Sequence, residues 1–426
     1  MDIKRNMETT KIDYSKYINE KPFTKWKLND IEFYMESRYE PYDITGQGTF
    51  GVVVACQDKE KEFFDEDSDF VAIKKIERAF EHTQYAIRTI REIKLQRMLA
   101  HENIIPIYKL LLPKSREQMN DIYLVEPLMT SDLRAIINSQ NEINEEHIQF
   151  LMYQIIRGLK YMHSAQIVHR DLKPKNVLSN EQGDLKICDF GFARHIQKNR
   201  VNDLSEYVTA RWYRAPEILL SYKKYDIAVD MWSCGIIMAE LLKRQPIIRG
   251  ASTDDQMRQI LQLIGSPDEY QVKDPEYKKL LSYFPYCPGK NFKLIFPNAS
   301  SQCLDLLKKL LQIDPSQRIT AEQALAHPFF EMLHDPSDEP DCEPINQAEF
   351  EYENYDLNDQ QLKDILYEEI LLYNSPEFRE QYYEKLKKGQ SVYSHIIGDV
   401  EDNDNDYDDD DEEDEEEDDD ETKKTN

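Results

Sequence analysis

A glycine-rich segment, and a lysine at the end of the strand-like run that follows it, could together hold a phosphate-bearing ligand. The segment GQGTFGVV carries Gly46, Gly48 and Gly51, and glycine lets a backbone approach phosphate oxygens closely. A dinucleotide-binding fold needs a helix directly after such glycines, whereas here the strand-like run GVVVACQ continues. Lys74 ends the next apolar run, VAIKK, and Glu92 in the helical pattern beyond offers it a carboxylate partner. The pattern indicates a nucleotide phosphate site on a strand pair.

Three further motifs follow in an order and spacing that chance does not produce. HRDLKPKN places Asp171, Lys173 and Asn176 close together in the chain, DFG adds Asp189, and APE ends the series at Glu217. Each tripeptide is common by itself, so the ordered set carries the argument. Phosphoryl transfer concentrates negative charge, and it therefore depends on positioned groups and cations in a water-poor cleft.

The elements that must position these residues change character near residue 132. Before it, short β-branched and aromatic runs broken by turns predict strands, and one helical pattern interrupts them at 83–100. The predicted strands cover residues 39–46, 51–57, 69–76, 104–112 and 121–128. After it, amphipathic patterns such as 144–165 and 227–242 predict helices, the first with a polar start at Asn144. Strands followed by helices indicate an α+β protein of two unequal lobes.

The charge of the chain is concentrated at one end. The formal net charge is −29, and 18 acidic residues without a single base lie between Glu401 and Glu421. An acidic chain is unsuited to binding nucleic acid or an anionic membrane, so we expect neither as a partner. The six cysteines form no CxxC pair, and the N-terminus has no apolar signal segment. These features favour reduced thiols and a cytoplasmic protein, with the nucleus as an open second location.

Taken together, the motifs resemble those of the eukaryotic protein kinases over residues 43–330. The finer match is to the mitogen-activated protein kinases, near the extracellular-signal-regulated branch. It is carried by RTIREIKLQRMLAHENII, LMYQIIRGLKYMHSAQIVHRDLKPKNVL, SEYVTARWYRAPEILL and LAHPFFEMLHDPSDEP. The resemblance implies the two-lobed kinase fold. Its expected parts are an N-terminal, loosely attached extension (1–36), a small β-rich lobe (37–130), a larger helical lobe (131–330), a C-terminal extension with helices (331–398) and a disordered acidic tail (399–426).

The resemblance also implies an ATP- and Mg²⁺-dependent serine/threonine kinase. Its expected substrates are proteins, which it would phosphorylate at serine or threonine followed by proline. Asp171 would orient the substrate hydroxyl, Lys173 would stabilise the transferring phosphate, and Glu92 would position Lys74. Asn176 and Asp189 would hold Mg²⁺, which prefers hard oxygen ligands. The expected ATP-binding residues are Thr45, Gly46, Gln47, Gly48, Gly51, Val53, Ala72, Lys74, Glu126, Pro127, Met129 and Asp132.

Two hydroxyl residues, Ser205 and Tyr207, match the dual phosphorylation sites of the family's activation lip. Each phosphate would add about −1.5 to −2 charges and could bind arginine. The resemblance assigns one set of arginines to the first phosphate and another to phosphotyrosine; the sets are Arg91, Arg170 and Arg194, and Arg211 and Arg214. Without phosphate these arginines should repel one another, which favours an inactive resting state.

The segment HDPSDEP matches the family's common docking site, so Asp335, Asp338 and Glu339 are expected to grip basic docking peptides. Expected partners are protein substrates and an upstream dual-specificity MAP kinase kinase, and the kinase itself is expected to be a monomer. Two alternatives stay open at this point. A cyclin-dependent kinase is disfavoured by the Ser-Glu-Tyr lip, and a catalytically dead scaffold is disfavoured by the intact catalytic motifs.

Five residues depart from the family pattern. Ser205 stands where relatives usually carry threonine at the first lip site. Thr45 replaces an isoleucine over the adenine, Glu126 puts an acid at the back of the nucleotide pocket, and Phe192 follows DFG in place of leucine. Ala210 stands where relatives carry a threonine that bonds the catalytic aspartate and lysine. The threonine appears one residue earlier, at 209.

The paired change of Thr209→Ala and Ala210→Thr should raise turnover. One hydrogen bond contributes about 0.5–1.5 kcal/mol, which corresponds to a rate change of roughly threefold to tenfold. Steady-state kinetics on a panel of peptides that differ after the phosphoacceptor would measure it. Unchanged rates and peptide preference in the double variant would show this idea to be wrong.

Overall fold

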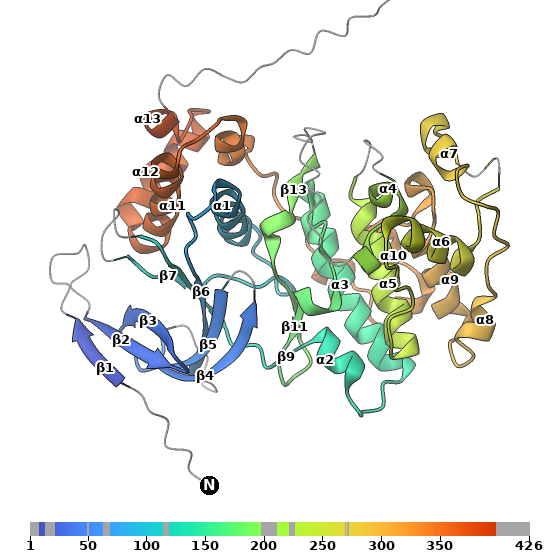
Figure 1. Cartoon of the computed structure of the whole chain (residues 1–426), viewed down its shortest axis with the longest axis horizontal. Helices are drawn as coiled ribbons and strands as arrows, with labels where there is room; N and C mark the ends of the chain where they lie inside the picture. The colour runs from blue at the N-terminus through green and yellow to red at the C-terminus, as the bar shows by residue number, and fades with distance from the viewer. Residues whose placement is uncertain are drawn as a thin grey trace, which may run out of the picture.

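The computed structural model describes residues 8–12, 22–48, 51–62, 69–113, 119–196, 211–220, 226–268, 270 and 272–397. These residues form a smaller lobe built on β-sheet and a larger helical lobe, joined by the segment after β8 (Figure 1). The α+β, two-lobed fold predicted from the sequence is confirmed.

The smaller lobe contains a five-stranded antiparallel sheet with one helix beside it. The strand order is β4-β5-β6-β8-β7. The strands are β4 (Tyr39–Gly48), β5 (Gly51–Asp58), β6 (Phe70–Ile76), β8 (Ile122–Pro127) and β7 (Lys109–Leu110), and the helix is α1 (Thr83–Met98). The register pairs Val53 with Lys74 and Ala72 with Glu126. Hydrogen bonding across the sheet thus gathers residues that the sequence assigned to the nucleotide site.

A second, three-stranded sheet corrects one expectation from the sequence. Its order is β1-β2-β3, with β1 (Glu8–Ile12), β2 (Phe23–Leu28) and β3 (Ile31–Glu36). Trp26, Phe33 and Met35 are buried in one cluster with core residues of the five-stranded sheet. Residues 23–36 are therefore not a loosely attached extension. Lys25, Lys27, Glu32 and Tyr34 alternate with these apolar residues, which is the period-2 pattern of a half-buried strand. The polar composition of the whole N-terminal segment had favoured an extension instead.

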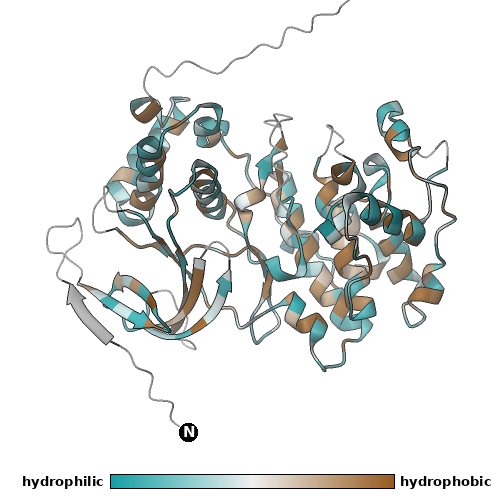
Figure 2. Ribbon diagram, in the orientation of Figure 1, coloured by the Kyte–Doolittle hydropathy of each residue, from teal (hydrophilic) through white to brown (hydrophobic). Residues whose placement is uncertain are grey.

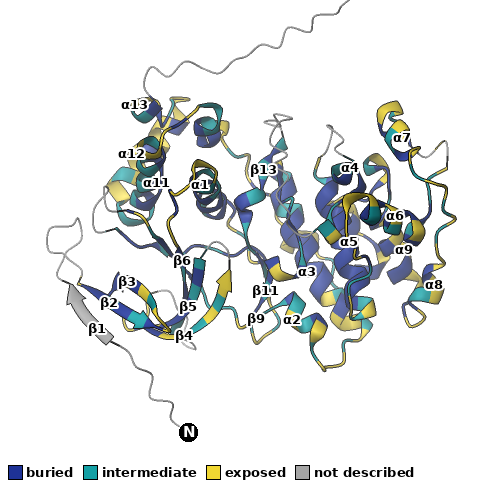
Figure 3. Cartoon of the chain, viewed as in Figure 1, coloured by how far each residue is buried: buried dark blue, intermediate teal, exposed yellow. Residues whose placement is uncertain are grey.

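The larger lobe is centred on two long helices, α3 (Glu145–Ser164) and α5 (Ala228–Lys243). Asn144 starts α3 as predicted, since its side chain accepts a hydrogen bond from the His147 backbone N–H. A Cβ at Gly235 would lie only 2.9 Å from Leu310 Cβ, so glycine permits the close packing of α5 on α9 (Ser301–Leu310). Apolar, buried residues concentrate where these helices meet (Figures 2 and 3).

The other elements of this lobe are short strands, smaller helices and 3-10 turns around that centre. The strands are β9 (Ser131–Asp132), β10 (Ile167–Val168), β11 (Val177–Ser179), β12 (Leu185–Ile187) and β13 (Arg194–His195). The helices are α2 (Leu133–Asn138), α4 (Pro216–Leu219), α6 (Thr253–Ile264), α7 (Pro275–Leu281), α8 (Phe292–Ile295) and α10 (Ala321–Leu325). The 3-10 turns are η1 (Pro174–Asn176), η2 (Phe190–Phe192), η5 (Arg211–Tyr213), η6 (Pro315–Gln317), η7 (Pro328–Phe330) and η8 (Pro336–Asp338).

The C-terminal extension returns to the smaller lobe and covers α1. It consists of η9 (Gln347–Asn354), α11 (Asp359–Asn374), α12 (Pro376–Lys387) and α13 (Ser394–Ile397). Helix α11 lies beside α1 (Figure 1), and their apolar residues share one core cluster. Asn374 Nδ2 also donates to the backbone O of Leu110 in β7, at 2.8 Å. The extension therefore covers both α1 and an edge strand of the sheet.

Among the described residues, helices with the length and apolar character needed to cross a bilayer are absent.

Replacing Phe33 by Ala should destabilise the protein by about 3–5 kcal/mol, because the ring is fully buried and its removal leaves a cavity. Tyr34, whose side chain is on the exposed face of the same strand, is the matched control, and Tyr34→Ala should cost about 1 kcal/mol or less. Urea unfolding followed by tryptophan fluorescence would measure both. Equal losses would contradict the packing of β3 as a core strand.

Candidate active site

Lys74 and Glu92 form an ion pair between the sheet and α1. Lys74 projects from β6, and its Nζ lies 2.5 Å from Glu92 Oε1. Burial acts to lower the pKa of Lys74, but the carboxylates of Glu92, Glu126 and Asp189 outweigh it and hold the pKa above its ordinary value. The ammonium is therefore charged at neutral pH, and the sheet and α1 are held in the arrangement that the sequence predicted for these two residues.

The catalytic-loop motif folds into a compact polar cluster between β10 and β11. Lys173 Nζ donates to Asp171 Oδ2 at 2.5 Å. Asn176 Nδ2 donates to the Asp171 backbone O at 2.9 Å, to its Oδ2 at 3.2 Å and to Asp189 Oδ2 at 3.3 Å. Burial raises the pKa of Asp171, while Lys173 acts against it. One amide thus holds the two aspartates in a fixed relation.

The DFG segment presents Asp189 to this cluster while burying Phe190. Asp189 adopts a left-handed backbone conformation with φ 68° and ψ 70°, a strained geometry that surrounding contacts must hold. The fully buried Phe190 ring packs edge-on against His169, with 5.4 Å between ring centroids. His169 Nε2 donates to the carbonyl O of Cys188 at 3.0 Å. Burial raises the pKa of the Cys188 thiol, which favours a packing role and disfavours a reactive thiolate.

Asp230 of α5 anchors the catalytic loop through hydrogen bonds from the loop backbone. Its Oδ2 accepts from the backbone N–H of His169 at 2.8 Å, and its Oδ1 accepts from that of Arg170 at 2.9 Å. Arg170 has φ 68°, so these two bonds stabilise an unfavourable backbone conformation. Burial alone would raise the pKa of Asp230, but bonding to His163 and the loop lowers it below its ordinary value. These contacts make Asp230 a buried anchor for the backbone of the catalytic loop.

The described glycines of the glycine-rich segment lie at the end of β4 and at the start of β5. Gly51 has φ +142°, and a Cβ there would lie 1.9 Å from the Lys75 carbonyl O, so only glycine fits. Thr45, Gly46, Gln47 and Gly48 lie on β4 and Val53 lies on β5. Strand β5 in turn pairs with β6, the strand that carries Lys74 and Ala72.

Residues after β8 join the two lobes at the expected adenine-binding position. Pro127 ends β8, Met129 packs against the core of the larger lobe, and Asp132 caps α2 by accepting from the Ala135 backbone N–H at 2.8 Å. That cap fixes Asp132 at the start of a helix, where its charge is favourable.

Glu126, on β8, is a buried carboxylate behind the nucleotide-binding residues. Gln96 on α1 donates to Glu126 Oε1 at 3.0 Å. Burial raises the pKa of Glu126 to about 6, against the opposing effect of Lys74. Its place at the back of a nucleotide pocket stays a prediction, and Gln96 is a partner that sequence reasoning did not find.

The arginines assigned to the lip phosphates differ in the charged groups that surround them in the structure. Arg91 pairs with Glu353 of the C-terminal extension, Nε to Oε1 at 2.8 Å. Burial lowers the pKa of Arg214, and Arg211 and Arg170 lower it further. Arg91 is therefore compensated by a carboxylate, which removes one source of the predicted repulsion, whereas Arg170, Arg211 and Arg214 still influence one another electrostatically. Ser205, Tyr207, Thr209 and Ala210 lie outside the described residues.

The expected docking acids differ in exposure. Asp335 is exposed and accepts from Ser337, and Asp338 keeps 63% of its side chain exposed while it pairs with Arg157. Glu339 is buried, with its Oε1 bonded to Tyr153 at 2.9 Å and to His334 at 2.8 Å. Two of the three carboxylates therefore face the surface.

The APE glutamate has a structural partner. Glu217 Oε1 and Oε2 accept from Arg318 at 2.7 Å and 3.0 Å, and both side chains are fully buried. This buried ion pair connects the start of α4 to the segment that follows η6 within the helical lobe.

The geometry can now be compared with known proteins. Residues 39–330, more than half of the chain, match the protein kinase domain family. The chain is 42% identical over 368 residues to extracellular signal-regulated kinase 1 of Dictyostelium discoideum, covering 86% of this chain and 68% of that protein.

Two plant proteins are similar to this chain at the same level of identity. Mitogen-activated protein kinase 6 of Arabidopsis thaliana is 42% identical over 84% of this chain and 89% of its own. Mitogen-activated protein kinase 5 of Oryza sativa subsp. indica is 42% identical over 82% and 94%. The chain belongs to the mitogen-activated protein kinases. It is therefore an ATP-dependent protein serine/threonine kinase, and upstream kinases and protein substrates are its implied partners.

Sequence reasoning missed the partners that hold α1 of this MAP kinase from outside the two lobes. Arg91, Lys94 and Arg97 occur at a spacing of three, which places them near one face of a helix. Cations on a buried helix face require carboxylates from another segment. That spacing was the available signal, although it could not identify the acidic residues that pair with these three cations.

Replacing Glu126 by Gln should stabilise the kinase at neutral pH. With a pKa of about 6 in place of about 4.5, native Glu126 binds more protons than the unfolded chain between these values, so its ionisation weakens the fold as pH rises. We expect a gain of about 2 kcal/mol near pH 7.5 and less than about 1 kcal/mol near pH 5.

Urea unfolding at both pH values measures this difference. Glu142→Gln, at an exposed position, is the control and should change neither value by more than about 0.5 kcal/mol. A gain for Glu126→Gln that does not depend on pH would mean that the carboxylate is not the cause.

Proposed function

We propose that this MAP kinase is switched on by phosphorylation of Ser205 and Tyr207 by an upstream dual-specificity kinase. It then transfers the ATP γ-phosphate to serine or threonine followed by proline. The observation that supports this most directly is the assembled catalytic cluster. Lys74 is paired with Glu92, and Asn176 joins Asp171 to Asp189.

In this proposal each side chain has a role that follows from its position. Lys74 holds the α- and β-phosphates, and Asp171 orients the substrate hydroxyl and accepts its proton. Lys173, already 2.5 Å from Asp171, stabilises the negative charge on the transferring phosphate. Positioning and fixed charge of this kind provide most of the catalysis in phosphoryl transfer.

The donor set at Asn176 and Asp189 fits Mg²⁺. Both side chains carry hard oxygen atoms, and the Asn176 amide donates to Asp189 Oδ2 at 3.3 Å, beside Asp171. When bound, the ion would supply positive charge to the nucleotide phosphates. Asn176 and Asp189 are therefore the residues that would hold it.

We propose that the acidic docking surface contains two of the three carboxylates that the sequence indicated. Asp335 and Asp338 are exposed and suited to basic docking peptides, whereas the burial of Glu339 assigns it to holding the loop. We propose a monomer that acts in the cytoplasm and enters the nucleus.

The test compares three forms of the whole chain on a peptide with a Ser-Pro site. The doubly phosphorylated kinase should be the most active form. Ser205→Ala with Tyr207→Phe should prevent that activation, and Asp171→Asn should lower kcat by about 10²–10⁴-fold with little change in nucleotide binding. The fourth measurement uses a Ser-Ala peptide, on which the active form should be slower.

Mass spectrometry of the lip peptide confirms the phosphorylation state of each form. If the doubly phosphorylated kinase matched the Asp171→Asn variant in rate, the catalytic assignment would fail. If instead it matched the lip double variant, only the activation step would fail.

A further inference from the structure

Helix α1 carries three cations on the side that faces the C-terminal extension. Arg91, Lys94 and Arg97 have side chains that are only 3%, 0% and 8% exposed. Cations buried to this degree are stable only with charged or hydrogen-bonded partners. Every charged partner that the structure gives them comes from the extension, at Glu349, Glu353 and Glu369.

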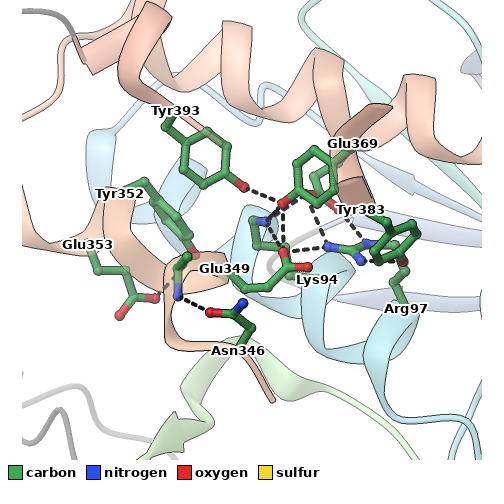
Figure 4. Close-up of polar contacts among 11 residues, drawn as sticks. Lys94, Arg97, Asn346, Glu349, Tyr352, Glu353, Glu369, Tyr383 and Tyr393 are labelled. Atoms are coloured by element: carbon green, nitrogen blue, oxygen red, sulfur yellow. Dashed lines mark hydrogen bonds and ion pairs between the residues drawn. The ribbon is translucent and has the colours of Figure 1, made fainter. Parts of the chain in front are cut away.

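Lys94 lies at the centre of this charge cluster (Figure 4). Its Nζ is 2.9 Å from Glu349 Oε2 and 2.7 Å from Glu369 Oε1. Tyr382 accepts a further bond at 3.2 Å, and the Tyr393 ring centroid is 5.0 Å from Nζ. These groups replace the water that a lysine normally retains. Residues from η9, α11, α12 and the approach to α13 thus converge on one ammonium.

Arg97 uses the same two carboxylates one helical turn further on. It donates to Glu349 Oε2 at 2.7 Å and to Glu369 Oε2 at 3.0 Å, and Tyr383 accepts at 2.9 Å. Burial would raise the pKa of Glu349, but Lys94 and Arg97 outweigh it and lower the pKa to about 2. Both carboxylates are shared between two cations, so the extension and α1 cannot separate without leaving charges unpaired.

Arg91 connects the extension to the DFG segment. Its Nε pairs with Glu353 Oε1 at 2.8 Å, and its Nη1 donates to the Gly191 carbonyl O at 2.9 Å. Burial opposes ionisation of Glu353, but Arg91 and Arg194 lower its pKa below the ordinary value. Arg91 also precedes Glu92, which pairs with Lys74, so a contact made by the extension fixes the neighbour of a catalytic residue.

The space beside Arg91 is too small for a phosphate. A cavity of about 10 Å³ lies there, which is about enough for a single water. It is lined by Arg91, Ala193, Arg194, His195, Phe350 and Glu353. A phosphate could reach Arg91 at this position only if Glu353 moved away.

We propose that Glu353 takes, on Arg91, the place that the family resemblance gives to the first lip phosphate. The Glu349–Glu369 pair holds α1 beside it, so that the Lys74–Glu92 ion pair forms before the lip is phosphorylated. Glu349, Glu353 and Glu369 are positioning residues of the extension. This inference rests on the proposed function for the identity of the phosphate, but not for the effect of Glu353 on α1.

The consequence is a competition between carboxylate and phosphate for one arginine. A phosphate carries about −1.5 to −2 charges, against −1 for Glu353, so it can displace the carboxylate and keep Arg91 neutralised. Glu353 should therefore matter most in the unphosphorylated kinase and least in the phosphorylated one.

The experiment places Glu353→Gln in two backgrounds of the full chain. One is the Ser205→Ala/Tyr207→Phe double variant, which cannot be phosphorylated on the lip, and the other is the wild-type lip after phosphorylation of both sites. Glu380→Gln, exposed on α12 of the same extension, is the matched control. Glu353→Asp keeps the charge and is the rescue variant.

In the unphosphorylatable background, Glu353→Gln should lower kcat by about 10- to 100-fold, as a displaced catalytic group does, with a smaller change in KM for ATP. Hydrogen exchange in residues 83–98 should become faster in the same variant. Glu353→Asp should restore part of both values. In the phosphorylated background the loss for Glu353→Gln should be less than about threefold, because phosphate replaces the carboxylate.

Hydrogen exchange keeps the two hypotheses separate, because it needs neither phosphorylation nor activity. Equal exchange in Glu353→Gln and Glu380→Gln would overturn the inference, as would an equal loss of kcat in both backgrounds. A wild-type lip that gives no activation when phosphorylated would instead reject the activation step of the proposed function.

Discussion

Lys74 and Glu92 come from different elements, and their contact can form only when α1 lies against the five-stranded sheet. The ammonium needs a carboxylate because it is buried, and its pKa is raised because Glu92, Glu126 and Asp189 surround it. The position of α1 therefore decides whether the phosphate-binding lysine is held in place. Much of the remaining structure can be understood as a way of keeping α1 and the catalytic loop in position relative to this pair.

In the larger lobe the same requirement is met by buried carboxylates with complete sets of partners. Asp230 holds the backbone of His169 and Arg170, and Glu217 holds Arg318. Such groups would be unfavourable if any partner were lost. They restrict the catalytic loop to one conformation and so keep Asp171 within reach of Asn176 and Lys173. In the smaller lobe, the extension provides the equivalent restraint on α1 through its shared carboxylates.

The sequence predicted the strands and helices that carry the motifs, because alternation, helical periodicity and capping are local properties. Asn144 is an example, since its position ahead of an amphipathic run was enough to place the start of α3. The catalytic residues were found in the same way, from ordered motifs. The hairpin at residues 23–36 was not found, because its apolar face is buried only through packing against the five-stranded sheet.

What the sequence determined by itself was the family and the two lobes, and it also named the candidate residues for handling phosphate. The tertiary structure alone decided which charges of α1 and the C-terminal extension neutralise one another. Glu353 lies 262 positions from Arg91, and Lys94 meets Glu349 across 255 positions. No local pattern relates residues at such separations, since many exposed acids in this chain could have served. Burial selects the pairs, because a charge removed from water is stable only beside the partner that the fold brings to it.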